Sequence, residues 1–177
     1  MRKSFVLALM GLVLAAAVAS ATTVAYVPMK RAVQMSELVL IGYVMGTEAV
    51  YDREGQIVTR IDLLVETPLK GGAGRGEIFS FYAWGGHLDG YNVETVGEAH
   101  YKTGQKVLVQ LENIEGDYHT LGLAFGKWDV VRDPAGKPWI TRNLEDLNMV
   151  GVTEAPVEQL PLDHMLRVVR EAARLAN

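Results

Sequence analysis

Two consecutive β-type segments joined by a tight turn constrain the fold of this chain more than any other feature. The first runs from Leu38 to Tyr51 and is apolar, with interruptions at Gly42 and Gly46 that weaken a flat strand but suit a sharply coiled one. Residues 52–55, Asp-Arg-Glu-Gly, predict a hairpin turn. In the second segment apolar and polar residues alternate, and a period of two predicts a strand with one buried and one solvated face. The expected buried face consists of Ile57, Thr59, Ile61, Leu63 and Val65, and the solvated face of Arg60, Asp62 and Glu66.

Shorter segments of the same kind follow. Gly-rich residues 70–76 predict a flexible loop, and a polar region opened by Gly85 and Gly86 continues to about Gly104. Residues 143–160 are expected to be irregular. Alternation and turn signals predict further strands over residues 77–84, 106–111, 119–123, 125–131 and 139–141.

Helices are expected at both ends of the domain. Pro28 stands at a tolerated first-turn position of a short helix over residues 28–35. Apolar side chains at helical spacing predict an amphipathic helix over residues 162–176, with Asp163 near its start. Because the chain has no internal repeat, we expect a single domain of the mainly β class. Its predicted architecture is a small antiparallel barrel of five or six strands, with a short N-terminal helix and a C-terminal amphipathic helix.

The first 21 residues have the pattern of a secretory signal peptide. Arg2 and Lys3 precede an apolar stretch, which ends in the small-x-small sequence Ala19-Ser20-Ala21. The apolar stretch is shorter than the roughly 20 residues that a membrane span requires. We therefore expect cleavage after Ala21 and export of residues 22–177 to the periplasm or the cell exterior. No later segment is long and apolar enough to predict a membrane span.

Composition narrows the possible partners and the sources of stability. The chain contains no cysteine, so the exported domain must be stable without disulfides, and its expected 156 residues suffice for one hydrophobic core. Loss of Arg2 and Lys3 with the leader lowers the basic residues from 17 to 15, against 21 acidic ones. Nucleic-acid binding depends on clustered Lys and Arg, and no such cluster occurs. A nucleic-acid partner is therefore not expected.

Several short segments recur in a characteristic order along roughly residues 32–131. They are Ser36–Val44, Ile57–Thr59, Thr67–Gly71, Gly85–Gly86, Gly104–Val109 and Gly126–Trp128. This order resembles a pattern found in exported bacterial proteins of unknown function. It is also similar to the netrin-like form of the oligonucleotide/oligosaccharide-binding (OB) barrel, as in the tissue inhibitors of metalloproteinases. The resemblance implies a barrel and not an activity, because those inhibitors place an N-terminal cysteine on the catalytic metal and this chain has no cysteine.

The residues needed for nucleophilic catalysis are scarce. Cysteine is absent, and the expected mature chain has only Ser36 and Ser80, neither of which lies in a nucleophile-elbow pattern. Ser80 stands between two phenylalanines in an expected strand, which indicates a structural role.

The four histidines, His87, His100, His119 and His164, lack the spacing of a helix-borne zinc site. His87 and His100 could still converge with Asp89, Glu94 or Glu98 in the polar region and bind a divalent cation. In the alternative interpretation His87 and His100 are exposed loop residues, His119 lies on the solvated face of a strand, and Glu94 and Glu98 are ordinary solvated acids.

Aromatic residues give the best indication of a binding surface. Phe81, Tyr82, Trp84 and Tyr91 cluster in sequence around a glycine pair, where a missing side chain lets another group approach closely. Tyrosine and tryptophan are also favoured at interfaces, although the same rings could fill the core of a small barrel. The candidate ligand-binding or partner-binding residues are Tyr82, Trp84, Gly85, Gly86, His87 and Tyr91.

Three functional hypotheses follow. The preferred one is an exported, non-catalytic module that binds a partner protein or a small polar ligand through the loops around residues 84–103, without a cofactor. The second is a metal-dependent hydrolase that uses His87, His100 and nearby acids. The third is an envelope-associated structural protein whose terminal helix packs on a partner.

Overall fold

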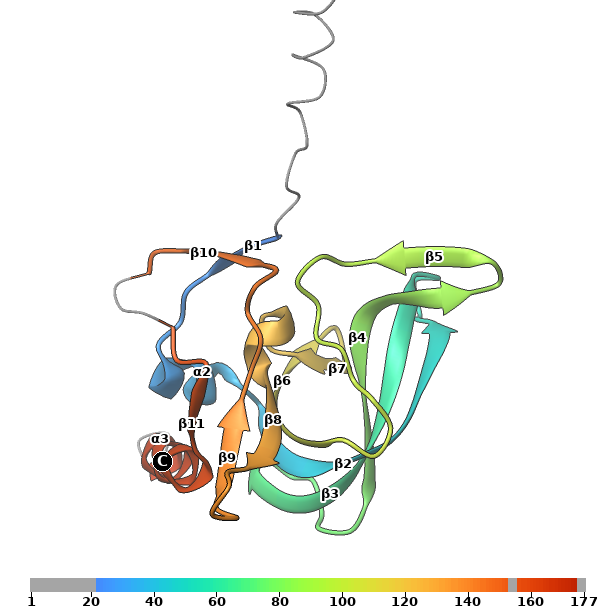
Figure 1. Ribbon diagram of the computed structural model, residues 1–177. Helices are drawn as coiled ribbons and strands as arrows, with labels where there is room; N and C mark the ends of the chain where they lie inside the picture. Colours follow the sequence, from blue (N-terminus) through green and yellow to red (C-terminus); the bar gives the residue numbers. More distant parts are fainter. Residues whose placement is uncertain (1–21, 153–155, 175–177) are drawn as a thin grey trace, which may run out of the picture.

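The computed structural model describes residues 22–152 and 156–174 as a mainly β fold with two α-helices in these segments (Figure 1). The signal peptide expected over residues 1–21 lies outside the described residues. The elements are β1 Thr22–Ala25, α2 Met29–Met35, β2 Leu38–Tyr51, β3 Ile57–Lys70, β4 Ile78–Leu88, β5 Tyr91–Glu94, β6 Lys106–Ile114, β7 Asp117–Thr120, η1 Leu123–Gly126, β8 Lys127–Arg132, β9 Pro138–Thr141, β10 Leu147–Val150, β11 Gln159–Pro161 and α3 Leu162–Arg174.

Five strands form a ring. β2 pairs with β3 and β3 with β4, β4 touches β7, β7 pairs with β6, and β6 returns to β2. Four of these pairings are antiparallel, and the contact of β4 with β7, at Tyr82 and His119, is parallel. The mainly β class is therefore confirmed. The ring differs from the expected antiparallel barrel because this single parallel contact closes it.

Further strands extend the sheet away from the ring. β6 also pairs with β8, and β9 and β11 follow in order. β9 is covered by β11 and is therefore not an edge strand. The expectation that residues 143–160 are irregular is wrong in part, because β10 pairs in parallel with β1 and β11 begins at Gln159. The strand expected from Phe125 begins at Lys127, since η1 occupies the preceding residues.

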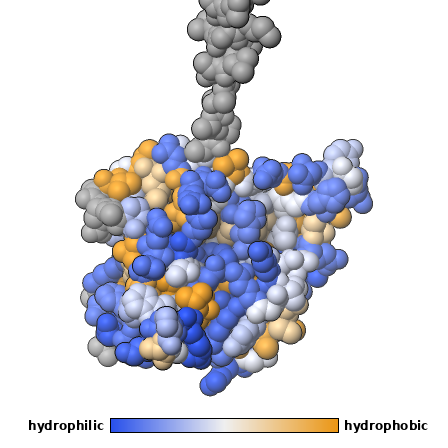
Figure 2. Space-filling view, in the orientation of Figure 1, coloured by the Kyte–Doolittle hydropathy of each residue, from blue (hydrophilic) through white to orange (hydrophobic). Residues whose placement is uncertain are grey.

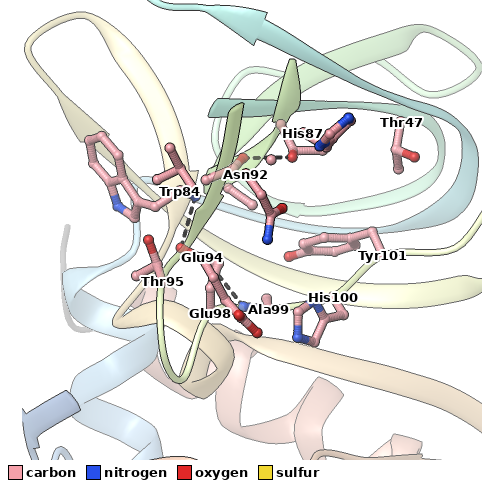
Figure 3. A pocket seen from close by; sticks show the side chains of 15 residues that line it. Thr47, Trp84, His87, Asn92, Glu94, Thr95, Glu98, Ala99, His100 and Tyr101 are labelled. Carbon is pink, nitrogen blue, oxygen red and sulfur yellow. Dashed lines mark hydrogen bonds between the residues drawn. The ribbon is translucent and has the colours of Figure 1, made fainter. Parts of the chain in front are cut away.

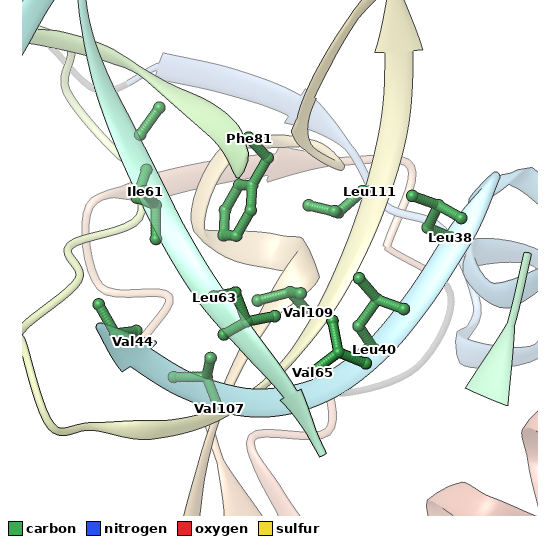
Figure 4. Packing of buried hydrophobic residues seen from close by; sticks show 11 residues of the cluster. Leu38, Leu40, Val44, Ile61, Leu63, Val65, Phe81, Val107, Val109 and Leu111 are labelled. Atoms are coloured by element: carbon green, nitrogen blue, oxygen red, sulfur yellow. The ribbon is translucent and has the colours of Figure 1, made fainter. Parts of the chain in front are cut away.

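The first hydrophobic core fills the inside of the ring (Figure 4). β2, β3, β4 and β6 all contribute alternate side chains to it, as period-two alternation requires. On β3 the predicted inward residues Ile61, Leu63 and Val65 are buried. The buried members are Leu38, Leu40, Val44, Ile61, Leu63, Val65, Phe81, Ala83, Val107, Val109 and Leu111.

A second core lies between the outer side of the sheet and the two helices. The first half of β2 is buried on both faces, because Leu38 and Leu40 point into the ring while Val39 and Ile41 pack in the second core. This double burial explains why the segment is continuously apolar. α2 and α3 close the second core, and Trp128 of β8 lies within it. Neither helix in the described segments is long and apolar enough to cross a membrane.

Gly42 allows β2 to coil as the sequence predicts. A Cβ atom at this position would collide with the backbone carbonyl of Leu64 and with the side chain of Leu63 on β3. The register between the two strands shifts beside Gly42 and again before Gly46. These bulges bend β2 so that it can pair with β3 on one side and with β6 on the other.

Candidate functional site

A pocket of about 370 Å³ lies where β4 runs beyond the ring (Figure 3). Here β4 turns back as a hairpin, so that Gly85 pairs with Glu94 and Leu88 with Tyr91 on β5. Residues 95–105, which link β5 to β6, then cross the face of the ring (Figure 1). We call them the crossing segment. One wall of the pocket is the β4–β5 hairpin, and the other is this crossing segment.

The two glycines of β4 are required by the chain's own packing. Gly85 has φ +86°, and a Cβ atom there would collide with the carbonyl of Val93 on β5. A Cβ atom on Gly86 would lie 2.9 Å from Thr59 Oγ1 and 3.1 Å from Ala49 Cβ. The close approach that the sequence analysis ascribed to a ligand or partner is therefore made by β5, β3 and β2.

Glu98 fixes the crossing segment to the ring. Its side chain carboxylate accepts hydrogen bonds from the backbone N–H of Trp84 at 2.9 Å and of Ala99 at 2.8 Å. The residue is only 7% exposed, so the expectation that it is a solvated acid is wrong. Burial raises the pKa of Glu98, and the two backbone hydrogen bonds partly offset this rise. Glu94, by contrast, is exposed as expected.

The pocket is polar and acidic. Of the described residues that line it, Glu94 and Glu98 bring carboxylates, and none is a lysine or arginine. In Figure 3 the side chains of Asn92 and Tyr101 point toward one another across the pocket, while the ring of Trp84 points away. The Tyr101 hydroxyl shares a hydrogen bond of 2.7 Å with Thr120 Oγ1, and burial raises the pKa of this phenol. These groups suit a ligand with hydroxyl or amine groups better than an anion.

Four of the six candidate binding residues line this pocket: Trp84, Gly85, Gly86 and His87. The other two lie elsewhere. Tyr82 borders a small hollow near the tips of the β2–β3 and β6–β7 hairpins, and Tyr91, 67% exposed, borders an open groove beside Tyr51. Alternation along β4 buries Phe81 inside the ring and places Tyr82 and Trp84 on the opposite face. Tyr82 and Trp84 both contact the ring of His119 and both border the small hollow, and Trp84 also borders the groove of Tyr91.

His119 is buried, contrary to the expectation that it faces solvent. It is 5% exposed because β7 lies between β4 and β6 within the ring and because the Trp84 ring covers it. Its Nδ1 atom has no hydrogen-bond partner among the described residues. Burial lowers the pKa of His119, and nearby Asp117 and Asp52 only partly counteract the effect.

His87 and His100 both line the pocket, together with Glu94 and Glu98, and to this extent the convergence expected for a metal site occurs. Within the described part of the chain, however, no three His, Asp or Glu side chains are arranged so that they could hold a metal ion. His164 lies in the first turn of α3 and is exposed.

Several residues that line the pocket could not be predicted from the sequence. Asn92, Thr47 and Tyr101 line it, but they lie on β5, β2 and the crossing segment, and no sequence pattern links them. For Glu98 the sequence suggests either an exposed acid or a ligand of a divalent cation, and not a buried group that anchors the chain. Its position between Gly97 and Ala99, two small residues that are also buried, is the one available signal of burial.

Comparison of the chain with protein-family models, with curated proteins and with solved structures returned no match.

Proposed function

We propose that this protein is an exported, non-catalytic binding module that holds a small polar ligand, neutral or cationic, in the pocket between the β4–β5 hairpin and the crossing segment. The observation that carries the proposal is the acidic lining of this pocket, which has two carboxylates and no lysine or arginine among its described residues. The leader-like first 21 residues support export.

We further propose that the ring is an OB-like barrel, similar to the netrin-like form. Numbered along the chain, its strands follow the order 1-2-3-5-4-1, with a parallel contact between the third and fifth. This order agrees with a five-stranded Greek-key barrel that is only partly closed.

Pocket size favours a small ligand over a protein partner. A volume of about 370 Å³ lies within the range of small-molecule sites, which is roughly 300–1,000 Å³. Glu94 is the exposed carboxylate of the pocket, whereas both oxygens of Glu98 accept backbone hydrogen bonds. We therefore expect Glu94 to contact a cationic group directly, whereas Glu98 holds in place the crossing segment that forms one wall of the pocket.

The serine residues of the domain support a non-catalytic role. Ser36 is buried and donates to the carbonyl of Ala32 at 2.8 Å at the end of α2. Ser80 donates to Asp62 at 2.7 Å across β3 and β4. Both hydroxyls thus make structural hydrogen bonds.

Calorimetric titration of the folded domain with putrescine, glycine betaine, glucose and inorganic phosphate tests the proposal. We expect saturable binding of one or more of the first three probes and none of phosphate. Glu94→Gln should weaken binding of the cationic probes, whereas Glu171→Gln, an exposed position on α3, should not. Phosphate binding in this pocket, or failure of all three other probes, would contradict the proposal. Stoichiometric zinc that is lost in His87→Ala or His100→Ala would favour the hydrolase hypothesis instead.

A further inference from the structure

A second pocket, of about 250 Å³, lies on the other side of residues 97–100. It is bounded by η1, by the start of β8 and by the residues that follow β9. In the orientation of Figure 2 the visible face of the molecule is largely hydrophilic. The polar groups that line the second pocket include Arg142, Lys127, Lys102, Gln105, Asp129 and Asp146.

Arg142 is held rigidly at this pocket. Its guanidinium carbon lies 4.1 Å from the centroid of the Phe125 ring and 4.0 Å from that of the Trp128 ring. In the plane of the group, Nη1 donates to the Phe125 carbonyl at 2.7 Å and Nε donates to the Val157 carbonyl at 2.9 Å. These two bonds use two of the five N–H groups of an arginine. The side chain is therefore oriented before any ligand arrives, so binding through its remaining N–H groups has a low entropic cost.

Among the described residues, Arg142 is a buried cation without an ion-pair partner. The residue is 8% exposed, and within the described segments no carboxylate lies at ion-pair distance from it. Burial lowers its pKa to about 10, with smaller opposing effects of Tyr26 and Glu158, so the group is still charged at neutral pH. Buried charges are normally paired. The described part of the chain thus supplies no anion for this cation.

A second cation of the pocket, the half-buried Lys127, is already neutralised. Lys127 Nζ lies 2.7 Å from Asp129 Oδ1, and the Gln105 side chain donates to the same oxygen. Asp129 is thereby engaged by two neighbours and is not a partner for Arg142. The positive charge that remains available in the interior of the pocket is that of Arg142.

We propose that this second pocket binds the carboxylate of a small molecule, with Arg142 as the anchoring residue. A planar guanidinium matches a carboxylate or a phosphate geometrically. Asp146 and Glu98 also line the pocket, and their negative charges oppose a phosphate dianion more strongly than a monoanion. The pocket therefore selects a monocarboxylate, with or without a neighbouring ammonium group.

The test is a calorimetric titration of the folded domain with propionate, alanine, sulfate and phosphate. We expect saturable 1:1 binding of propionate or alanine and weaker or no binding of the two inorganic anions. Arg142→Lys, which keeps the charge but loses the planar fork, should weaken carboxylate binding by about tenfold or more. Asp146→Asn removes a repelling charge and should strengthen propionate binding by about threefold.

The Asp146→Asn variant keeps the test decisive if Arg142→Lys fails to fold, because a gain in affinity cannot arise from a damaged structure. Glu94→Gln is the matched control, since Glu94 lines the first pocket and not the second. If Glu94→Gln loses putrescine binding but retains propionate binding, the two ligands bind at separate sites. Three results would each overturn the inference: no saturable carboxylate binding below about 10 mM, equal binding of sulfate, or a propionate affinity that neither pocket substitution changes.

Discussion

The indole ring of Trp84 stacks on the imidazole ring of His119, with centroids 4.2 Å apart and ring planes inclined by 15°. The stack lies beside the parallel contact between β4 and β7 that closes the five-stranded ring. Because His119 is buried and its Nδ1 atom has no acceptor, protonation would place an unpaired charge inside this closure. The geometry therefore favours a neutral imidazole.

This burial predicts a loss of stability in mild acid. The folded-state pKa of His119 lies below its ordinary value of 6.5, so between these two pH values the unfolded chain binds a proton that the folded one does not. The contribution is fully present above pH 6.5 and decreases as the pH falls toward the lowered value. His119→Phe should remove it, and urea denaturation at several pH values measures the difference. His164→Phe, at an exposed position on α3, is the control. A variant whose pH dependence equals that of the wild type would contradict this assignment.

Lys70 should stabilise the fold through the end of α2. Its ammonium group donates to the carbonyls of Val33 at 2.9 Å and of Gln34 at 3.0 Å, and also to that of Ser36. These carbonyls lie at the C-terminal end of the helix, where backbone acceptors lack intrahelical partners and the helix dipole favours a cation. Lys70→Met should lower the free energy of unfolding by about 1–3 kcal/mol, as measured in urea. Lys137→Met, at an exposed position, should change it little; similar losses in both variants would contradict the capping role.

The strands and the burial of the ring could be predicted from sequence because local periodicity encodes them. The alternation at Ile61, Leu63 and Val65 fixes which face of β3 is buried, and the glycine at position 42 marks where β2 bends. The strands β1, β10 and β11 could not be predicted in this way. Each has only three or four residues, and each depends on a partner distant in the sequence.

The candidate site could be predicted only in part, for the same physical reason. The glycine pair drew attention to β4, and Trp84 and His87 do line the pocket. Alternation places Tyr82 and Trp84 on one face of β4. That this face is covered by His119 of β7 depends, however, on a pairing that involves a single residue pair. The burial of Glu98 and of Arg142 likewise results from tertiary packing, and local sequence periodicity does not predict it.

The C-terminal helix should be part of the folding unit. Met165, Val169 and Ala172 of α3 are buried against the outer side of the sheet. Met165→Ala should therefore destabilise the domain by about 2–5 kcal/mol, because it removes buried methylene groups and leaves a cavity. Arg170→Ala, on the exposed side of the same helix, is the control. Equal thermal unfolding of the two variants would instead indicate a helix that packs loosely and is available to a partner.

Glu94 and Glu98 provide a matched pair for testing how the pocket wall is held. Replacement of Glu98 by glutamine puts an amide group where one of the two backbone N–H groups now meets an oxygen, so one hydrogen bond is lost. Glu98→Gln should lower the free energy of unfolding at neutral pH by about 1–3 kcal/mol. Glu94→Gln, with the same chemistry at an exposed position, should change it by no more than about 0.5 kcal/mol.

The pH dependence of the same pair gives an independent readout. Burial raises the folded-state pKa of Glu98 above 4.5, so between 4.5 and the raised value the folded chain binds the extra proton. Wild-type stability should therefore decrease through this window as the pH rises, and Glu98→Gln should lack that component. The difference in free energy of unfolding between the wild type and Glu98→Gln should therefore become smaller as the pH rises. If the pKa of Glu98 were lowered instead, this difference would become larger. Urea denaturation across this range distinguishes the two signs, and amide hydrogen exchange at Trp84 and Ala99 should accelerate in Glu98→Gln and not in Glu94→Gln.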